Sequence, residues 1–252
     1  ECADKSAIYK YLAQRHISER TADYLDIRQD DRGNLVFNYY DENDVLTMVK
    51  YRPARKIRHG EAKNWCQPGA DTIPLLFNMN RINPEQPLLI CSGELDCAAA
   101  IEAGWSNAVS IPLGDGNVEC YDWLEQFSSI IICHDNDESG MKFLKTVSPM
   151  LGAWRCKVIN LPEHVDIDGE SYPVKDLNEY LYRCGKDAVL EQILSAEDTP
   201  VPSVVDLSDV EPTEYEDVDG ITFGLKALDD ELMRLFFGTL TIISGQPGSG
   251  KS

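Results

Sequence analysis

The stretch IIICHDNDESG, residues 130–140, decides the fold class of this chain. The apolar run from Ile130 to Cys133 predicts a short buried strand, and two carboxylates, Asp135 and Asp137, follow it directly. Helical spacing begins just after them. A strand that ends in acids and leads into a helix is typical of an open parallel sheet, in which ligands bind outside the carboxyl ends of the strands.

The same alternation of strand and helix recurs around this stretch. Four apolar runs are predicted to be strands, at residues 88–92, 107–113, 128–135 and 156–162. Five segments with helical spacing lie between and after them, at residues 94–104, 118–127, 138–151, 175–185 and 186–194. Continuous apolar strands alternating with helices predict an α/β fold with a parallel sheet and helices on both faces.

A smaller α+β region is predicted before this sheet. Residues 4–28 show helical spacing, with Ser18 as a candidate N-cap. Two alternating runs within residues 34–57 flank Asp-Glu-Asn-Asp and predict a hairpin. The stretch that leaves the hairpin, residues 50–63, is locally basic, with Glu61 as its one acid against Lys50, Arg52, Arg55, Lys56, Arg58 and Lys63.

Overall composition excludes several classes of protein. The net charge of −20 argues against a surface generally coated with nucleic acid. The eight cysteines contain no CxxC pair, which indicates buried thiols in a reducing compartment and neither a zinc site nor a disulfide framework. No apolar run is long enough to span a bilayer, and the first residues lack the apolar core of a signal peptide. The acidic, proline-bearing segment 196–219 predicts a linker.

A second acidic cluster is predicted at the end of another strand. Gly93 and Glu94 follow the apolar run 88–92, so Glu94 should lie near Asp135 and Asp137 at the same edge of the sheet. Carboxylates gathered in this way suit Mg²⁺ or Mn²⁺, which would also bind substrate phosphates. The alternative is that each acid caps the helix that follows it.

These motifs resemble the Toprim domain of primases and topoisomerases. GELDCAAAIEAG, residues 93–104, is followed about forty residues later by IIICHDNDESG, and SIPLGDGN lies between them as in primases. The resemblance implies catalytic and metal-binding roles for Glu94, Asp135 and Asp137. KDLNEYL, residues 175–181, is similar to an element that follows in primases and implies Asp176 as a further metal ligand. The motifs alone do not separate primase from topoisomerase or nuclease.

The basic stretch favours the primase among these alternatives. Lysine and arginine bind phosphate as a point charge and as a bidentate fork. By resemblance to the basic N-terminal subdomain of primases, Lys50, Arg52 and Lys63 are expected to bind nucleoside triphosphates and the template. Trp65 either stacks on a base or packs within the protein.

The last residues fit a phosphate-binding loop. GQPGSGKS follows an expected strand at 238–244 and contains Gly245, Gly248, Gly250, Lys251 and Ser252 as ATP-binding residues. Residues 221–252 resemble the opening of a hexameric RecA-like helicase domain. We expect this chain to be a fragment of a longer protein, with its helicase ATPase truncated and inactive. No N-terminal zinc-binding module is apparent.

This order of parts resembles the bacteriophage primase-helicase family and the related Twinkle-type helicases. It implies a basic subdomain at 1–85, a Toprim domain at 86–195, the linker at 196–219 and a truncated RecA-like start at 220–252. The implied function is Mg²⁺-dependent RNA primer synthesis on single-stranded DNA in a bacterial or phage-infected cytoplasm, or alternatively in the mitochondrial matrix or nucleoid. A hexameric parent, an RNA primer and a replication polymerase are the expected partners. A Toprim nuclease and a non-catalytic DNA-binding or assembly region are the alternatives.

Overall fold

The structure, a computed structural model, describes residues 4–57, 60–70, 75–112, 121–199, 220–232, 234–240, 242 and 244–246. The chain divides into two compact units, Glu1–Val204 and Val205–Ser252. The finer boundaries expected after residues 85, 195 and 219 remain predictions. Most of the expected linker 196–219 lies outside the described residues.

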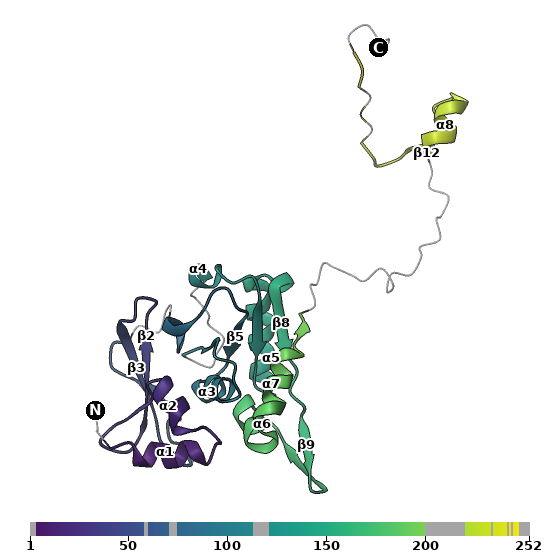
Figure 1. Cartoon of the computed structure of the whole chain (residues 1–252). Coiled ribbons are helices and arrows are strands. Elements are labelled where there is room, and N and C mark those ends of the chain that lie inside the picture. Colours follow the sequence, from purple (N-terminus) through teal and green to yellow (C-terminus); the bar gives the residue numbers. More distant parts are fainter. Residues whose placement is uncertain are drawn as a thin grey trace. The chain divides into compact units, whose positions relative to one another are not determined.

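A five-stranded sheet forms the centre of the first unit (Figure 1). Its order is β11-β8-β7-β5-β6. The four parallel strands are β5 (Leu88–Cys91), β6 (Ala108–Ser110), β7 (Ile130–Cys133) and β8 (Cys156–Ile159). A short antiparallel strand, β11 (Glu197–Asp198), forms one edge. Every residue of β5, β6 and β7 is buried, which confirms a parallel sheet that is covered on both faces.

The helices follow the predicted alternation. They are α3 (Glu94–Glu102), α4 (Tyr121–Leu124), α5 (Glu138–Leu151), α6 (Leu177–Cys184) and α7 (Lys186–Leu194). The chain steps from β5 to β6 in one direction across the sheet and from β6 to β7 to β8 in the other. Right-handed crossovers therefore place α3 on one face and α4 and α5 on the opposite face. Helices α6 and α7 pack against α3.

The N-terminal part of this unit has the predicted α+β character. It contains α1 (Ser6–Ala13), α2 (Glu19–Tyr24), β1 (Arg28–Gln29), β2 (Leu35–Tyr40), β3 (Leu46–Arg52) and β4 (Trp65–Cys66). The four strands form an antiparallel sheet, and β2 and β3 are the predicted hairpin. Ser18 caps α2 by accepting a hydrogen bond from the Thr21 backbone N–H, as expected. The rings of Phe37 and Tyr39 lie 5.6 and 5.3 Å from that of Phe77, so these strands share one core with the segment before β5.

One hairpin in this unit is absent from the sequence prediction. Strands β9 (His164–Ile167) and β10 (Glu170–Pro173) pair antiparallel around Asp168 and Gly169, which both have positive φ. Asp-Gly is the usual signal for such a two-residue turn. Two 3₁₀ helices, η1 (Met79–Arg81) and η2 (Ala153–Arg155), complete the described elements of the unit.

The second unit contradicts one prediction. It contains β12 (Gly220–Ile221), α8 (Lys226–Leu232) and β13 (Leu235–Phe236), and β12 pairs with β13. The strand expected at 238–244 is not formed at its described residues, because no neighbouring strand pairs with them. Leu240 and Ile242 are accordingly 87% and 80% exposed. Of the predicted phosphate-binding residues, Gly245 is described, while Gly248, Gly250, Lys251 and Ser252 lie outside the described residues.

The RecA-like start therefore remains a prediction.

None of the helices in the described part of the chain is both long enough and apolar enough to cross a membrane.

Candidate functional site

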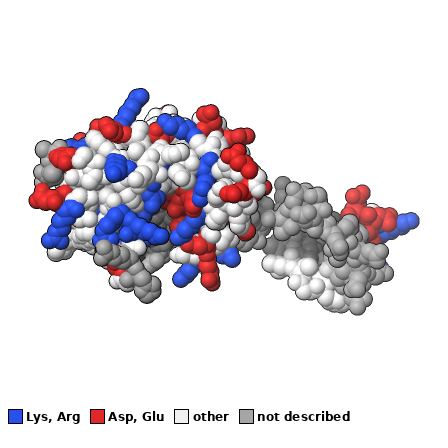
Figure 2. All heavy atoms as spheres, turned by 90° about the horizontal axis from the view of Figure 1, so that it is seen from below, with Lys and Arg blue, Asp and Glu red and all other residues white. Residues whose placement is uncertain are grey.

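A cleft of about 250 Å³ lies at the carboxyl ends of β5 and β7. Its acidic wall carries all four predicted carboxylates, Glu94, Asp135, Asp137 and Asp176. Its basic wall carries Lys50, Arg52 and Lys63. The face of the molecule in Figure 2 shows basic and acidic side chains gathered side by side around a hollow. The structure thus brings the two predicted residue sets into one cavity.

Glu94, at the start of α3, is a buried acid whose charge is already compensated. Its Oε1 lies 2.5 Å from the Lys50 ammonium and accepts a hydrogen bond of 2.5 Å from the Tyr39 hydroxyl. Lys50 Nζ also donates to the Pro112 carbonyl at 2.6 Å. Burial, followed by the charge of Glu94, raises the pKa of Tyr39 well above its ordinary value, so Tyr39 stays a donor.

Asp96 has the opposite environment, because it forms no salt bridge among the described residues. It is 7% exposed and its Oδ1 accepts the Asn178 backbone N–H at 3.0 Å. Burial raises the pKa of Asp96 well above its ordinary value, and the negative charges of Asp176 and Asp135 raise it further. The hydrogen bond from the Asn178 backbone N–H and the charge of Arg52 oppose this rise in the pKa only in part. Asp96 therefore belongs to an acidic cluster whose charge the protein leaves largely uncompensated.

Asp135 lies at the end of β7 beside the loop that follows β5. The Ser92 hydroxyl donates to its Oδ1 at 2.6 Å, so Ser92 rather than Glu94 is its hydrogen-bond partner. The backbone of Asp135 packs on the first turn of α5. A Cβ added to Gly140 would lie 2.0 Å from the Asp135 carbonyl oxygen, which explains why glycine follows the acidic loop at this position.

Asp137 and Asp176 are both helix N-caps. Asp137 Oδ1 accepts the Gly140 N–H at 2.9 Å at the start of α5, and Asp176 Oδ1 accepts the Glu179 N–H at 2.7 Å at the start of α6. The capping alternative is therefore correct for both residues. Each cap uses one carboxylate oxygen. The second oxygen of Asp137 lies 3.6 Å from the Lys175 ammonium, whereas no salt bridge to Asp176 is found among the described residues.

The basic wall is only partly neutralised. In the part of the chain that the structure describes, Arg52 and Lys63 form no salt bridge, and the Arg52 Nε is buried without a hydrogen-bond partner. A buried, unpaired guanidinium N–H is costly unless an anion binds it. Trp65 is 41% exposed and stacks on Tyr51 at 5.7 Å, so it both packs and presents ring surface.

The donor set fits a divalent cation in kind. Aspartate oxygens are the hard ligands that Mg²⁺ and Mn²⁺ prefer, and the uncompensated charge around Asp96 is what a cation would neutralise. Among the described residues, no three acids, histidines or cysteines already converge in metal-ligand geometry. The predicted metal ligands Asp135, Asp137 and Asp176 line the same cleft as Asp96, and their role as ligands remains a prediction.

Several residues of this cleft were not predicted. Asp96 had a signal, because it lies two residues after Glu94 in the same strand-end motif. Ser92 had none, since a serine after a strand is common in loops. Arg15, which also lines the cleft, comes from the turn after α1, far away in the sequence.

A Toprim-like family matches residues 89–181. The chain is 28% identical to the Twinkle homolog protein, chloroplastic/mitochondrial, of Arabidopsis thaliana, over 97% of this chain and 37% of that protein. It is 27% identical to the DNA helicase/primase of Enterobacteria phage T3, over 99% of this chain and 44% of that protein. The chain thus spans less than half the length of both curated relatives.

A solved structure has the same fold. It is that of the bacteriophage T7 lagging-strand DNA polymerase interacting with primase domains of two gp4 subunits, bound to an RNA/DNA hybrid and dTTP. The match has a TM-score of 0.60 at 23% identity and covers 74% of this chain and 91% of the matched chain.

Proposed function

We propose that this protein synthesises RNA primers on a single-stranded DNA template, because it carries a Toprim-like domain and resembles the Toprim primase region of primase-helicases. One observation carries the proposal: Lys50, Arg52 and Lys63 share a single cleft with Asp135, Asp137 and Asp176. Nucleotidyl transfer needs cations for phosphates on one side and acids for a divalent metal on the other.

The reaction joins two nucleotides. The 3′-hydroxyl oxygen of one attacks the α-phosphorus of a nucleoside triphosphate and releases its proton to solvent. The bond from the α-phosphorus to the bridging oxygen of the β-phosphate breaks, and pyrophosphate leaves. Asp135, Asp137 and Asp176 would hold Mg²⁺ or Mn²⁺ through carboxylate oxygens, and Asp137 would exchange its contact with the Lys175 ammonium for the ion. When bound, such an ion supplies positive charge to the phosphates and lowers the pKa of the attacking hydroxyl.

The basic wall would position the triphosphate and the template. Arg52 offers its buried Nε–H, and Lys63 adds a second charge. Lys50 has three N–H donors, of which one contacts Glu94 and one donates to the Pro112 carbonyl. One donor is left for a phosphate. We therefore assign Glu94 to holding Lys50 in place. To act as the general base or metal ligand that the sequence suggests, Glu94 would have to leave Lys50.

The relatives' names suggest the setting of this reaction. The phage relative is named a helicase/primase, and the T7 structure pairs primase domains with a polymerase and an RNA/DNA hybrid. By analogy, the partners here would be single-stranded DNA, the RNA primer, a replication polymerase and a hexameric helicase ring. The site of action would be the cytoplasm of a bacterial or infected cell, or an organelle that replicates its own DNA.

The test is synthesis of labelled primers from four nucleoside triphosphates and Mg²⁺ on single-stranded DNA. The wild-type chain should make short RNA, Asp135→Asn should make none, and Glu85→Gln, an exposed acid outside the cleft, should match the wild type. Equal synthesis by Asp135→Asn and the wild type would refute the proposal. Degradation of DNA without nucleotides would show that the cleft is a nuclease site.

A second candidate is a non-catalytic nucleic-acid-binding region. Two contacts favour this function. Glu94 forms a salt bridge with Lys50, and Asp135 accepts a hydrogen bond from the Ser92 hydroxyl, so neither acid is held solely for a metal ion. This function predicts oligonucleotide binding without primer synthesis in the same assay.

A further inference from the structure

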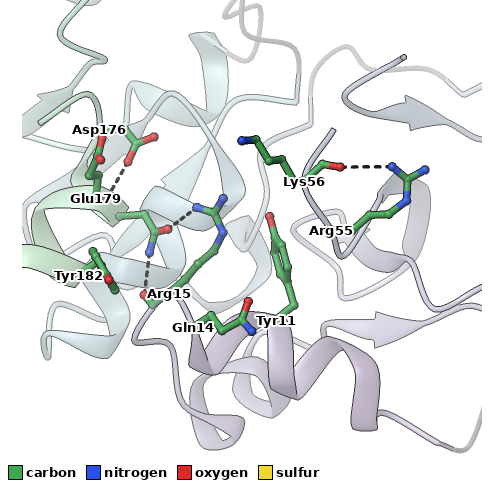
Figure 3. Close-up of a pocket in the computed structure, with 9 residues that line it drawn as sticks. Tyr11, Gln14, Arg15, Arg55, Lys56, Asp176, Glu179 and Tyr182 are labelled. Atoms are coloured by element: carbon green, nitrogen blue, oxygen red, sulfur yellow. Dashed lines mark hydrogen bonds between the residues drawn. The ribbon is translucent and has the colours of Figure 1, made fainter. Parts of the chain in front are cut away.

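A second cavity, of about 440 Å³, adjoins the cleft. Helix α1 contributes Tyr11, and the turn that follows it contributes Arg15. The segment after β3 contributes Arg55 and Lys56, and α6 contributes Tyr182 (Figure 3). Arg15 and Asp176 line both cavities, so the two are continuous at these residues. A volume of this size accommodates a small ligand of the dimensions of a nucleotide. We call this cavity the α1–α6 pocket.

Arg15 is held in a fixed orientation at the junction. Its Nη1 donates to the Asn178 Oδ1 at 2.8 Å, and the Asn178 Nδ2 donates to the Arg15 carbonyl at 3.1 Å. Asn178 is 1% exposed, and its backbone N–H donates to Asp96. The guanidinium is therefore pre-organised by a buried amide, and its remaining N–H groups are left for an anion.

The acids of the pocket are already engaged, whereas two of its cations are not. Asp176 caps α6, and Glu179 accepts the Lys175 backbone N–H at 3.1 Å and pairs with Arg183 at 3.9 Å. Within the described ranges, neither Arg15 nor Lys56 forms a salt bridge with a carboxylate. Arg55, by contrast, is paired with Glu61. Arg15 and Lys56 thus give the pocket positive charge that no carboxylate neutralises within the described residues.

Aromatic surface completes the chemistry. Tyr182 is 46% exposed, although its ring also contacts the His16 ring at 5.0 Å and the Arg183 guanidinium at 5.2 Å. The Arg15 guanidinium lies 5.0 Å from the centre of the Tyr11 ring. Figure 3 shows Tyr11, Arg15 and Lys56 directed toward the same space. Cations for phosphate next to aromatic rings for bases are the combination by which proteins bind single-stranded nucleic acid.

We infer that the α1–α6 pocket binds one nucleotide of the strand that passes through the adjoining cleft. Arg15 and Lys56 contact its phosphate, and the base rests against Tyr11 and Tyr182. The inference rests on the proposed function, since the cleft is taken to act on nucleic acid. Template DNA and primer RNA share this chemistry, and separate binding measurements distinguish them.

The experiment measures binding of the whole chain to fluorescein-labelled oligo(dT) and oligo(U) by fluorescence anisotropy, without nucleotides or metal. Tyr182→Ala should weaken binding about fivefold, the scale of one lost base–aromatic contact. Lys56→Ala should lower the slope of log K against log salt by about 0.7, the value of one phosphate contact on a single strand. Lys10→Ala, an exposed lysine on the same helix as Tyr11, and Trp154→Ala, a 78% exposed aromatic elsewhere, are the matched controls.

The outcomes are separable. Loss for oligo(dT) alone supports the pocket as a template site, and loss for oligo(U) alone or for both strands supports it as a primer or general strand site. If the pocket variants bind both strands like their controls, or if the wild type binds neither strand, the inference is overturned. Primer synthesis that requires Asp135 would leave the proposed function standing in that case. Conversely, pocket-dependent binding without any primer synthesis would retain the pocket and remove the catalytic function.

Discussion

Helix α3 carries three buried acids in two different environments. Its glutamates, Glu94 and Glu102, each lie 2.5 Å from a lysine on another element, Lys50 and Lys186. Asp96 has no such partner among the described residues and instead lies near Asp135 and Asp176. Glu94 and Glu102 are held by opposite charge and hydrogen bonds. Asp96 is close to two other carboxylates, whose repulsion the Asn178 N–H and Arg52 offset only in part.

This difference separates structural acids from candidate ligands. A buried carboxylate paired with lysine holds one element against another, and loss of either partner should lower the free energy of unfolding. A buried carboxylate among other carboxylates contributes little to stability, and such clusters concentrate at functional sites. Glu94 and Asp96 are two residues apart in the sequence, so nearness to a motif does not decide the role.

The largest effect is expected when the Lys50–Glu94 pair is broken. Lys50→Met leaves Glu94 buried without its partner, which should lower the free energy of unfolding by about 3 to 5 kcal/mol. Chemical denaturation monitored by circular dichroism measures the change. The double variant Lys50→Met/Glu94→Gln should recover much of the loss. A single variant as stable as the wild type would show that the pair is not structural.

A somewhat smaller effect is expected at Gly140. In an exposed helix, Gly→Ala stabilises by about 1 kcal/mol. Here the added Cβ would collide with the Asp135 carbonyl oxygen, so Gly140→Ala should destabilise by about 1 to 3 kcal/mol and displace the acidic loop. Ser139→Ala, at the neighbouring exposed position, is the control. A stabilised Gly140→Ala protein would contradict the packing of this loop on α5.

Glu102 provides a pH test of the structural acids. Burial opposes its ionisation, but hydrogen bonds from Lys186, Thr21 and Ser18 prevail and lower its pKa to about 2. The carboxylate therefore adds stability above its unfolded pKa of about 4.5, and this contribution is lost as the pH falls toward 2. Glu102→Gln should cost about 2 kcal/mol at pH 7, and the difference from the wild type should shrink in acid. A cost that does not change with pH would exclude an ionic role.

The smallest effect on stability is expected within the acidic cluster. Asp135→Asn keeps an acceptor oxygen for the Ser92 hydroxyl and removes a charge that raises the pKa of Asp96. In metal-free buffer we expect its free energy of unfolding to lie within about 0.5 kcal/mol of the wild type. Thermal denaturation in the presence of a chelator measures this. A loss of about 2 kcal/mol would place Asp135 with the structural acids.

Much of the sheet was predictable because its strands are continuous apolar runs and the helices between them have helical spacing of apolar residues. The predicted limits of the helix at 138–151 coincide with those of α5, and Ser18 caps α2 as expected. The strand expected at 238–244 failed because apolar composition does not supply a pairing partner. The β9–β10 hairpin is the opposite case. Its Asp168-Gly169 turn is a hairpin signal in the sequence, but the flanking residues are not an apolar run and were not predicted to be strands.

The site was predictable only in part, for a physical reason. Acids at strand ends converge by topology, so Asp135 and Glu94 could be placed in one cleft. Which acid receives a lysine depends on the hairpin that carries Lys50, and local sequence does not reveal that contact. Arg15 and Asn178 form a hydrogen bond although they are 163 positions apart in the sequence, and no local sequence pattern predicts such a contact.

Binding of Mn²⁺ followed by electron paramagnetic resonance compares the two kinds of acid most directly. Asp135→Asn should weaken Mn²⁺ binding at least about tenfold relative to the wild type, since loss even of a residue that only orients a ligand costs that much. Glu94→Gln should leave the affinity within about twofold. If Glu94→Gln abolishes binding while Asp135→Asn binds normally, the division between structural acids and metal-binding acids is contradicted.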